Sequence, residues 1–384
     1  MKRGKKEIGY RVKILKLDSL PHELLVEILS RLPVRHLWSL RSVSRSWLNL
    51  ITRNPSFAKL NFDRILKLKS NHLYPRILPL ENKDDFYLAI NYSSSDKAIR
   101  LNNLFGDLSQ YYVGGTCDGM ICLPHKNNNE VYILNPLTKD YIAIQCSPFP
   151  SNRFPGYIKF TTFSFGYDHC SNKYKLVRTC CESYYVKKEY HSEISVYTLS
   201  VNSTWRVIKE DVNVGLDSRP ETIPLVNGVL HWLTKRTGSS LHDLIGAFDL
   251  KDEVFREVPP PSDLDFNDRD IKKDIMELGG LLSIFWRPYS ADCEIWMMEE
   301  YGVINSWTKK FKIKHHLQIY TLGIALTGGI SLIENLENLV LFNQETNSFI
   351  NFRGFPFRRS CAYPFIASLI SPRLITGACD AIAE

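Results

Sequence analysis

The most regular pattern of apolar and polar positions lies near the N-terminus and has the period of an α-helix. Apolar residues recur at spacings of one, three and four, which a 3.6-residue period gathers on one wide face. They are Leu24, Leu25, Ile28, Leu29 and Leu32. Asp18 and Ser19 supply capping oxygens just upstream, and Pro33 ends the helix.

A second apolar run follows and also repeats every three or four residues. Its members are Leu37, Leu40, Val43, Trp47, Leu50 and Ile51. Ser44 is placed to cap a helix within this run, and Asn54 with Pro55 closes the unit. The pattern therefore predicts a unit of three short helices.

This helical unit holds more apolar surface than a segment of roughly 45 residues can bury by itself. Leu24 and Leu25 point about 100° apart, so one can pack inward while the other faces a partner helix. A helical cap packed on the rest of the chain is an alternative. A three-helix DNA-binding domain is another, because the unit contains arginines, but these are spread along it rather than gathered on one late helix. The arginines are Arg35, Arg41, Arg45 and Arg53.

From about Tyr111 onward, short β-rich runs alternate with polar turns. Each of five pairs of runs is predicted to form two strands joined by a turn. They are 131–134 with 141–144, 195–199 with 205–208, 246–250 with 254–258, 294–298 with 307–313, and 339–343 with 348–352.

The five pairs recur with a loose period. Equivalent positions at Asn135, Leu199, Asp249, Glu299 and Asn343 are separated by 64, 50, 50 and 44 residues. Propeller blades have periods of about 40 to 50 residues. The pattern therefore predicts a mainly β chain with a small α domain, in which a propeller of about six blades follows the helices. A pair of β-sandwiches built from the same short strands is the alternative.

Charge is concentrated at the N-terminus. The chain of 384 residues has a formal net charge of +7 and is 44% hydrophobic. Residues 1–16 contain seven Lys or Arg and one Glu, a net +6, which leaves +1 for the rest. This balance argues against a large nucleic-acid-binding face. The basic N-terminus is interpreted as a disordered tail, with a nuclear-import signal as the alternative.

Targeting and cysteine patterns indicate an intracellular protein. The N-terminus is charged and lacks the apolar run of a secretory signal, and no apolar stretch reaches the ~18 residues of a membrane span. Nine cysteines are scattered without a C-x-x-C pair, which fits a reducing compartment. We therefore expect the cytoplasm, the nucleus or both, and no membrane partner.

Candidate catalytic and metal-binding patterns are weak. Residues 115–119 fit G-x-C-x-G, a thiol version of the nucleophile elbow, but that elbow needs a helix where 120–124 predicts a strand. Cys117, Cys122 and His125 lack a fourth partner for zinc. We therefore expect no catalytic residue, no metal and no cofactor.

The helical segment resembles the F-box, the module that binds Skp1 in cullin-RING ubiquitin ligases. A dozen matching positions appear in order between Leu20 and Phe57. The resemblance implies a Skp1-binding surface formed by Leu20, Pro21, Leu24, Leu25, Ile28, Leu29, Leu32, Pro33, Leu37, Leu40, Val43, Trp47 and Ile51.

The C-terminal part resembles the F-box-associated domain of plant F-box proteins, a group that includes kelch-like and pollen S-locus members. Six segments support the resemblance: 115–123, 134–139, 165–168, 174–177, 227–232 and 365–372. It implies a non-catalytic substrate receptor of an SCF ubiquitin ligase, which binds Skp1 directly, cullin through Skp1, and an unknown target protein. A Skp1-binding interaction protein without a degradative role is the alternative.

These interpretations divide the chain into parts and suggest where a target would bind. We expect a basic tail at 1–17, the F-box at 18–62, a linker and the start of the C-terminal domain at 63–105, the propeller-like domain at 106–375 and a tail at 376–384. Long polar loops are the target-binding candidates. They are 147–157, 184–191, 235–243 and the acidic stretch 259–274, which contains Asp263, Asp265, Asp268 and Asp270.

Overall fold

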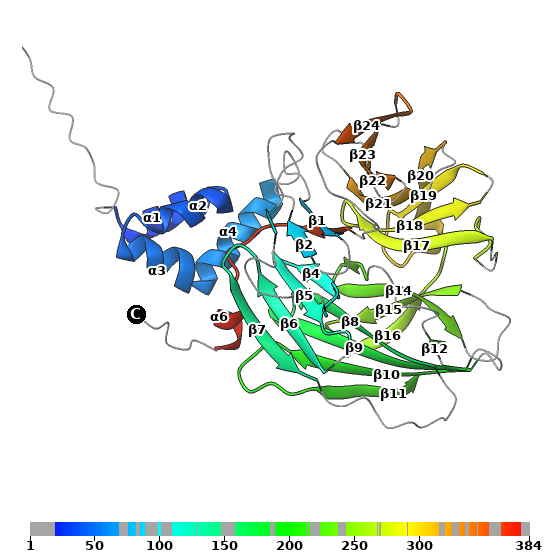
Figure 1. The fold of residues 1–384 in the computed structure, drawn as a ribbon, viewed down its shortest axis with the longest axis horizontal. Helices are drawn as coiled ribbons and strands as arrows, with labels where there is room; N and C mark the ends of the chain where they lie inside the picture. Colours follow the sequence, from blue (N-terminus) through cyan, green and yellow to red (C-terminus); the bar gives the residue numbers. More distant parts are fainter. Residues whose placement is uncertain are drawn as a thin grey trace, which may run out of the picture.

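A computed structural model of the chain shows helices on one side of a ring of β-sheets (Figure 1). It describes residues 20–68, 76–81, 85–88, 99–100, 110–127, 129–146, 158–184, 189–212, 214–215, 223–236, 243–266, 268, 270–289, 291–314, 319–324, 330–334, 338–343, 345–352 and 362–377. The predicted basic tail, the capping residues Asp18 and Ser19 and the loop 147–157 lie outside the described residues.

The three predicted helices are confirmed, and a fourth, which was not predicted, follows them. They are α1 (His22–Leu29), α2 (Val34–Leu40), α3 (Arg45–Arg53) and α4 (Pro55–Leu68). Ser44 caps α3 as predicted, accepting a hydrogen bond from the Trp47 amide at 3.3 Å. The Asn54 side chain, however, accepts from the Phe57 amide at 2.9 Å and so starts a further helix, in which Pro55 occupies a position that tolerates proline.

Helix α4 packs against the end of α1 and satisfies its backbone. The buried Asn61 side chain donates to the carbonyls of Ser30 at 2.9 Å and Leu32 at 3.0 Å. Carbonyls at the C-terminus of a helix have no partner within the helix, so a buried amide is an effective donor for them. Helix α4 runs to Leu68, beyond the boundary that was predicted at residue 62.

The described residues of the remaining chain form six antiparallel sheets of four or five strands, the number of blades that the period predicted. Blade 1 contains β25 (Ala362–Phe365), β1 (Arg76–Glu81), β2 (Asp85–Leu88) and β3 (Ile99–Arg100). Blade 2 contains β4 (Gly115–Cys117), β5 (Met120–Pro124), β6 (Glu130–Asn135) and β7 (Asp140–Gln145). Blade 3 contains β8 (Ile158–Asp168), β9 (Lys173–Tyr184), β10 (Glu189–Thr198) and β11 (Arg206–Val212).

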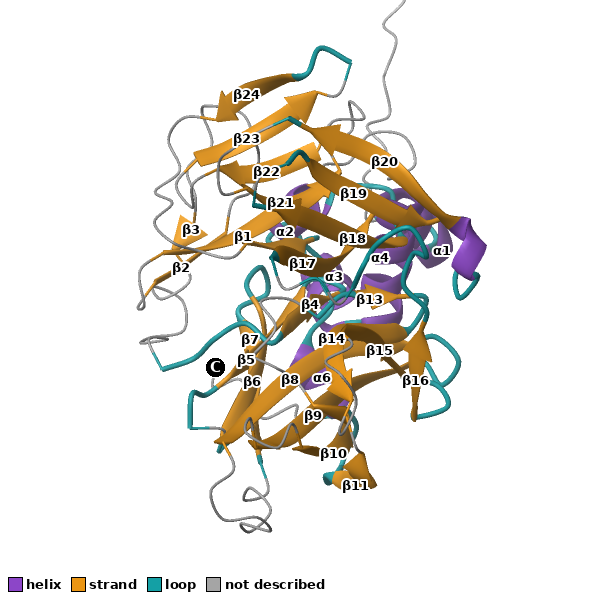
Figure 2. Cartoon of the chain, turned by 90° about the vertical axis from the view of Figure 1, so that its right-hand side faces the viewer, coloured by secondary structure: helices purple, strands orange, loops and turns teal. Residues whose placement is uncertain are grey.

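The other three blades continue the same order around the ring (Figure 2). Blade 4 contains β12 (Val214–Gly215), β13 (Leu225–Val226), β14 (Val229–Arg236), β15 (Asp243–Asp249) and β16 (Val254–Val258). Blade 5 contains β17 (Ile271–Leu278), β18 (Leu281–Pro288), β19 (Cys293–Met298) and β20 (Trp307–Ile313). Blade 6 contains β21 (Ile319–Ile324), β22 (Ile330–Glu334), β23 (Asn338–Asn343) and β24 (Ser348–Phe352).

Each predicted strand pair corresponds to the last two strands of a blade. In three blades the turn between these strands starts with an Asn or Asp whose side chain accepts a hydrogen bond from the backbone amide two residues later. The residues are Asn135, Asp249 and Asn343, with distances of 2.9, 2.8 and 2.9 Å. Such side-chain turns set up a tight reversal between strands. The repeated Asn or Asp at the start of the turn explains why these hairpins could be predicted from the sequence.

The ring is closed by strands from opposite ends of the chain. Strand β25 pairs with β1 from Arg76 opposite Phe365 to Pro79 opposite Ala362. The segment 63–105, predicted as a linker and the start of the domain, therefore contributes the end of α4 and three strands of blade 1. Closure leaves no unpaired first strand at the start of the domain.

Candidate protein-binding surfaces

The apolar face of α1 is divided between an inward and an outward side. Leu25 and Leu29 are only 5% and 2% exposed, whereas Leu24 and Ile28 are 51% and 45% exposed. Because Leu24 and Ile28 are four residues apart, they lie next to each other on the outer side of the helix. The split that was predicted from the helical period is confirmed.

The predicted Skp1-binding residues fall into three classes of exposure. Five are buried within the chain: Leu25, Leu29, Leu37, Trp47 and Ile51. Three are half-buried: Leu20, Leu32 and Leu40. Five are exposed: Pro21, Leu24, Ile28, Pro33 and Val43. Exposed Leu48 on α3 was not predicted, since its neighbour Trp47 carries the periodic signal.

Ion pairs hold α1 in place against α4. Arg64 of α4 binds the Glu27 carboxylate, donates to the Glu27 carbonyl at 3.0 Å and also binds the Ser30 hydroxyl. Arg31 pairs with the same carboxylate. Hydrogen bonds from Arg64 and then Arg31 lower the pKa of Glu27 below its ordinary value. The exposed leucine and isoleucine of α1 therefore project from a helix that is fixed to its neighbour.

The propeller has two ends, and the helices contact one of them. In an antiparallel meander, successive connections alternate between the two ends of the sheet. Lys59 of α4 lies 3.3 Å from Asp118, in the turn between β4 and β5. Arg373 of α6 (Pro372–Thr376) donates to the Tyr141 carbonyl at 3.2 Å, near the start of β7. We call the end with these turns the helix-side end and the opposite one the far end.

The described parts of the predicted target-binding loops belong to the far end. The ends of 184–191 lie in β9 and β10, those of 235–243 lie in β14 and β15, and 259–274 leads from blade 4 into β17 of blade 5. Loop 147–157 and parts of the first two lie outside the described residues. Tyr289, between β18 and β19, is 87% exposed at this end and was missed because a single aromatic in a polar loop has no periodic signal.

The acidic loop at the far end is tied to the blade beneath it. The buried Lys273 donates to the carbonyls of Phe266 at 2.6 Å and Asp268 at 2.9 Å. Phe266 is itself buried, with its ring 5.7 Å from that of Trp286. Asp263 and Asp265 remain exposed on this anchored backbone. The loop therefore presents its carboxylates from a defined position.

The thiol-elbow alternative does not fit the geometry around Cys117. Asp118 and Gly119 have φ values of 48° and 78° and form a tight turn into strand β5, where the elbow requires a helix. Burial raises the pKa of the Cys117 thiol well above its ordinary value, which keeps the sulfur protonated. Within the described residues, no group of three or more His, Cys, Asp or Glu is placed to hold a metal ion.

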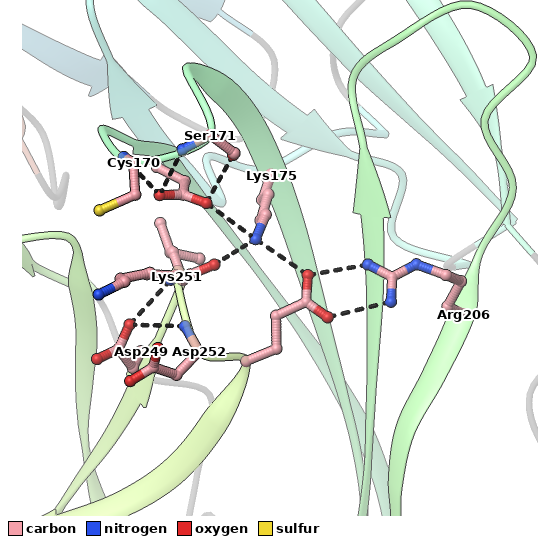
Figure 3. Close-up of polar contacts among 10 residues, drawn as sticks. Cys170, Ser171, Lys175, Arg206, Asp249, Lys251 and Asp252 are labelled. Atoms are coloured by element: carbon pink, nitrogen blue, oxygen red, sulfur yellow. Dashed lines mark hydrogen bonds and ion pairs between the residues drawn. The ribbon is translucent and has the colours of Figure 1, made fainter.

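A buried charge network lies between blades 3 and 4 (Figure 3). Lys175 is 3.1 Å from Asp168 and 3.0 Å from Glu253, and it also donates to the Leu250 carbonyl. Arg206 binds both Glu253 oxygens, at 2.9 and 3.1 Å. Burial alone would raise the pKa of Asp168, but hydrogen bonds from Ser171, the Cys170 amide and Lys175 lower it to about 2. Two cations balance two carboxylates, which indicates a tie between blades rather than a reactive site.

None of the helices in the described ranges has the length and apolar character needed to cross a membrane.

Comparison with known proteins agrees with this architecture. The family model described as "F-box associated beta propeller domain" matches residues 76–354, and the "F-box domain" model matches 17–59. F-box protein At3g07870 of Arabidopsis thaliana is 26% identical, over 78% of this chain and 74% of that protein. F-box/kelch-repeat protein At3g23880, from the same plant, is 26% identical over 86% of this chain and 89% of that protein.

One solved structure has a weaker similarity to this chain. The β-propeller domain of the Trilobed protease from Pyrococcus furiosus covers 74% of this chain and 98% of its own, with 7% identity and a TM-score of 0.33. The six sheets and the two family matches do not depend on this likeness. The chain thus belongs to the F-box proteins that carry an F-box associated β-propeller domain.

Proposed function

We propose that this F-box protein is the substrate-recognition subunit of an SCF ubiquitin ligase. The observation that supports this role most directly is the outward side of α1, where Leu24 and Ile28 are about half exposed on a helix fixed to the rest of the chain. In this role the F-box binds Skp1, cullin joins through Skp1, and the propeller binds the target protein.

Skp1 binding is supported by the kind of surface that the helices leave uncovered. Val43 and Leu48 add exposed apolar area to that of α1, at 56% and 38% exposure. Apolar side chains at helical spacing are the usual contact of a partner helix. The buried residues Leu25, Leu29 and Trp47 serve this surface by holding the helices that carry it.

Target binding is assigned to the far end of the propeller. The helix-side end is contacted by α4 and α6 at blade 2, through the Lys59 contact with Asp118 and the Arg373 contact with Tyr141. The anchored acidic loop and Tyr289 lie at the far end. Loops on a rigid scaffold are where binding residues of this kind of domain are expected.

Proximity is the mechanism in this proposal. Joining a target and a ubiquitin-charged enzyme in one complex turns transfer between them into an effectively intramolecular step. The chain then needs two separate binding surfaces at a fixed distance, and the bond chemistry belongs to other subunits.

The Skp1 assignment is tested by substituting the two outward residues of α1. We expect Leu24→Asp with Ile28→Asp to lower capture of Skp1 and cullin by about 100-fold or more, because two charges would be buried in an apolar interface. Both side chains are exposed in the chain itself, so the fold should be retained. Circular dichroism and thermal unfolding verify this.

A matched control places the same charge on an exposed apolar residue elsewhere. Val207 on β11 is 52% exposed, and Val207→Asp should capture Skp1 as the natural protein does. Undiminished capture by the Leu24 and Ile28 double variant would show that Skp1 docks elsewhere or that the F-box is not a Skp1-binding module here.

A further inference from the structure

Most of the sequence motifs that mark the C-terminal domain gather at its contact with the F-box helices, not at the far end. Segment 115–123 contributes Asp118 and Gly119, segment 134–139 contributes Asn135, and segments 165–168 and 174–177 contribute Tyr167 and Tyr174. Segment 365–372 runs beside them from the end of β25. Target recognition gives no reason for these segments to meet here.

Lys59 of α4 is the F-box side of this contact. Its ammonium nitrogen lies 3.3 Å from the Asp118 carboxylate, 3.3 Å from Asp63 and 4.3 Å from the centre of the Tyr167 ring. Burial alone would lower the pKa of Lys59, but Asp118, Asp63 and then Tyr167 raise it above its ordinary value. The lysine is therefore charged and is held by groups from both domains.

Asp118 is held in turn by the propeller. Tyr174 donates a hydrogen bond to the same carboxylate at 2.9 Å. The Asp118 backbone is left-handed, with φ of 48°, and its carbonyl accepts from the Ser368 hydroxyl at 2.5 Å. The carboxylate that meets Lys59 is thus oriented by β9 and by the C-terminal segment.

Residues 366–371, which we call the C-terminal segment, complete the contact. The buried Asn135 side chain donates to the carbonyls of Ser368 at 3.0 Å and Ile370 at 2.8 Å. Leu369 and Ile370 belong to the same buried cluster as Phe57 and Phe62 of α4. This segment lies beyond residue 354, where the propeller family match ends.

We infer that Lys59, Asp118 and the C-terminal segment fix the orientation of the F-box on the propeller. Lys59 and Asp118 are positioning residues: they bind neither Skp1 nor a target in this assignment, but they set the geometry between the two surfaces. The role of this fixed geometry in holding a target at a set distance from Skp1 rests on the proposed function, whereas the contact between the F-box and the propeller does not. The chain passes from α4 into the propeller at β1 of blade 1, so contacts with blades 2 and 3 are needed to prevent rotation about this single connection.

Hydrogen exchange of the full chain bound to Skp1 tests the contact. We compare the natural protein with Lys59→Met, with Asp118→Asn and with a chain that ends after Phe365. Methionine keeps the length of lysine, and asparagine tolerates the left-handed backbone. Backbone amides at 55–62 and 117–121 should exchange about fivefold faster in the two substitutions, and faster still in the shortened chain.

Lys310→Met is the matched control, because Lys310 forms an exposed ion pair with Glu299 inside blade 5. It should leave exchange at 55–62 and 117–121 unchanged. A chain that ends after Gly377 is the control for the shortening, since it keeps α6 and the C-terminal segment.

Orientation itself is read by small-angle X-ray scattering of the same complexes. The natural complex should fit one arrangement of the F-box and propeller, and the variants should require a spread of arrangements with a larger maximum dimension. Unchanged exchange and unchanged scattering in all three variants would overturn the inference. If the natural chain fails to bind Skp1, the proposed function is wrong. Hydrogen exchange and scattering of the natural chain and its variants without Skp1 then still test whether Lys59, Asp118 and the C-terminal segment fix the orientation of the F-box.

Discussion

The buried histidine of strand β14, His231, affects the stability of the fold through its protonation. His231 is fully buried, its Nε2 atom is 2.7 Å from the Tyr301 hydroxyl, and its Nδ1 atom has no hydrogen-bond partner among the described residues. Burial lowers the pKa of His231 from 6.5 to about 4. The native state therefore requires the neutral imidazole.

Stability should consequently fall in mild acid. Below pH 6.5 the unfolded chain binds a proton at His231 that the folded chain does not bind until about pH 4. The loss from this group between pH 7.5 and pH 5 is ~2 kcal/mol. Urea unfolding across this range should show the loss, and His231→Gln, which keeps a partner for Tyr301, should reduce it. Equal pH dependence in both proteins would contradict the prediction.

Gly119 is a second residue on which the contact between the domains depends. Its φ is 78°, and an added Cβ would lie 2.5 Å from the Ser368 hydroxyl and 2.7 Å from the Ile366 carbonyl oxygen. Gly228 has nearly the same φ, 77°, with nothing near its Cβ position. We expect Gly228→Ala to cost about 1 kcal/mol and Gly119→Ala about 3 kcal/mol or more, measured by chemical unfolding. Equal costs would show that the C-terminal segment does not pack as described.

Elements of the fold differ in how far the sequence could predict them. Helices α1 to α3 and the outer hairpins were visible because their signals are local: apolar period, Ser44 as a cap, and Asn135 or Asp249 at the start of a turn. Helix α4 was missed because Asn54 followed by Pro55 can end one helix or begin another. The pairing of β25 with β1 was not predictable from local pattern, since it joins positions 365 and 76.

The binding surface of α1 and its contact with the propeller could also be predicted only in part from the sequence. The sequence predicted which face of α1 was apolar, and the structure divided it into Leu24 outside and Leu25 inside. Lys59 and Asp118 carry no local signal, because their meaning depends on a contact between two domains. The alternative, a cap packed on the remaining chain, describes the side of the helical unit that contacts the propeller, whereas docking of a partner on the exposed side stays a prediction.

At the scale of whole strands, a buried ion network joins two blades. Lys175→Met leaves the carboxylates of Asp168 and Glu253 without their shared cation. Removing one partner from a buried set of charges costs about 3 kcal/mol, whereas an exposed pair contributes well under 1 kcal/mol. Thermal unfolding should therefore show a large loss for Lys175→Met and almost none for Lys310→Met, whose pair is exposed. Similar losses would mean that the network is not a structural tie.

The whole molecule combines exposed apolar side chains on the F-box helices with a propeller that closes on itself. Exposed apolar groups such as Leu24, Ile28 and Val43 favour association of the free chain. We expect soluble yield to rise several-fold when Skp1 is co-expressed, and the Leu24→Asp, Ile28→Asp chain to be soluble without Skp1. Fractionation of lysates measures both. Equal solubility of the natural chain with and without Skp1 would contradict this.

Quantitative proteomics with the natural chain and the Leu24→Asp, Ile28→Asp variant tests the role of substrate receptor most directly. Both proteins keep the far end of the propeller, so both should capture the same set of proteins. Some captured proteins should fall in abundance only with the natural chain, and inhibiting the proteasome should restore them. If every captured protein keeps the same abundance with either chain, the protein binds partners without directing their degradation.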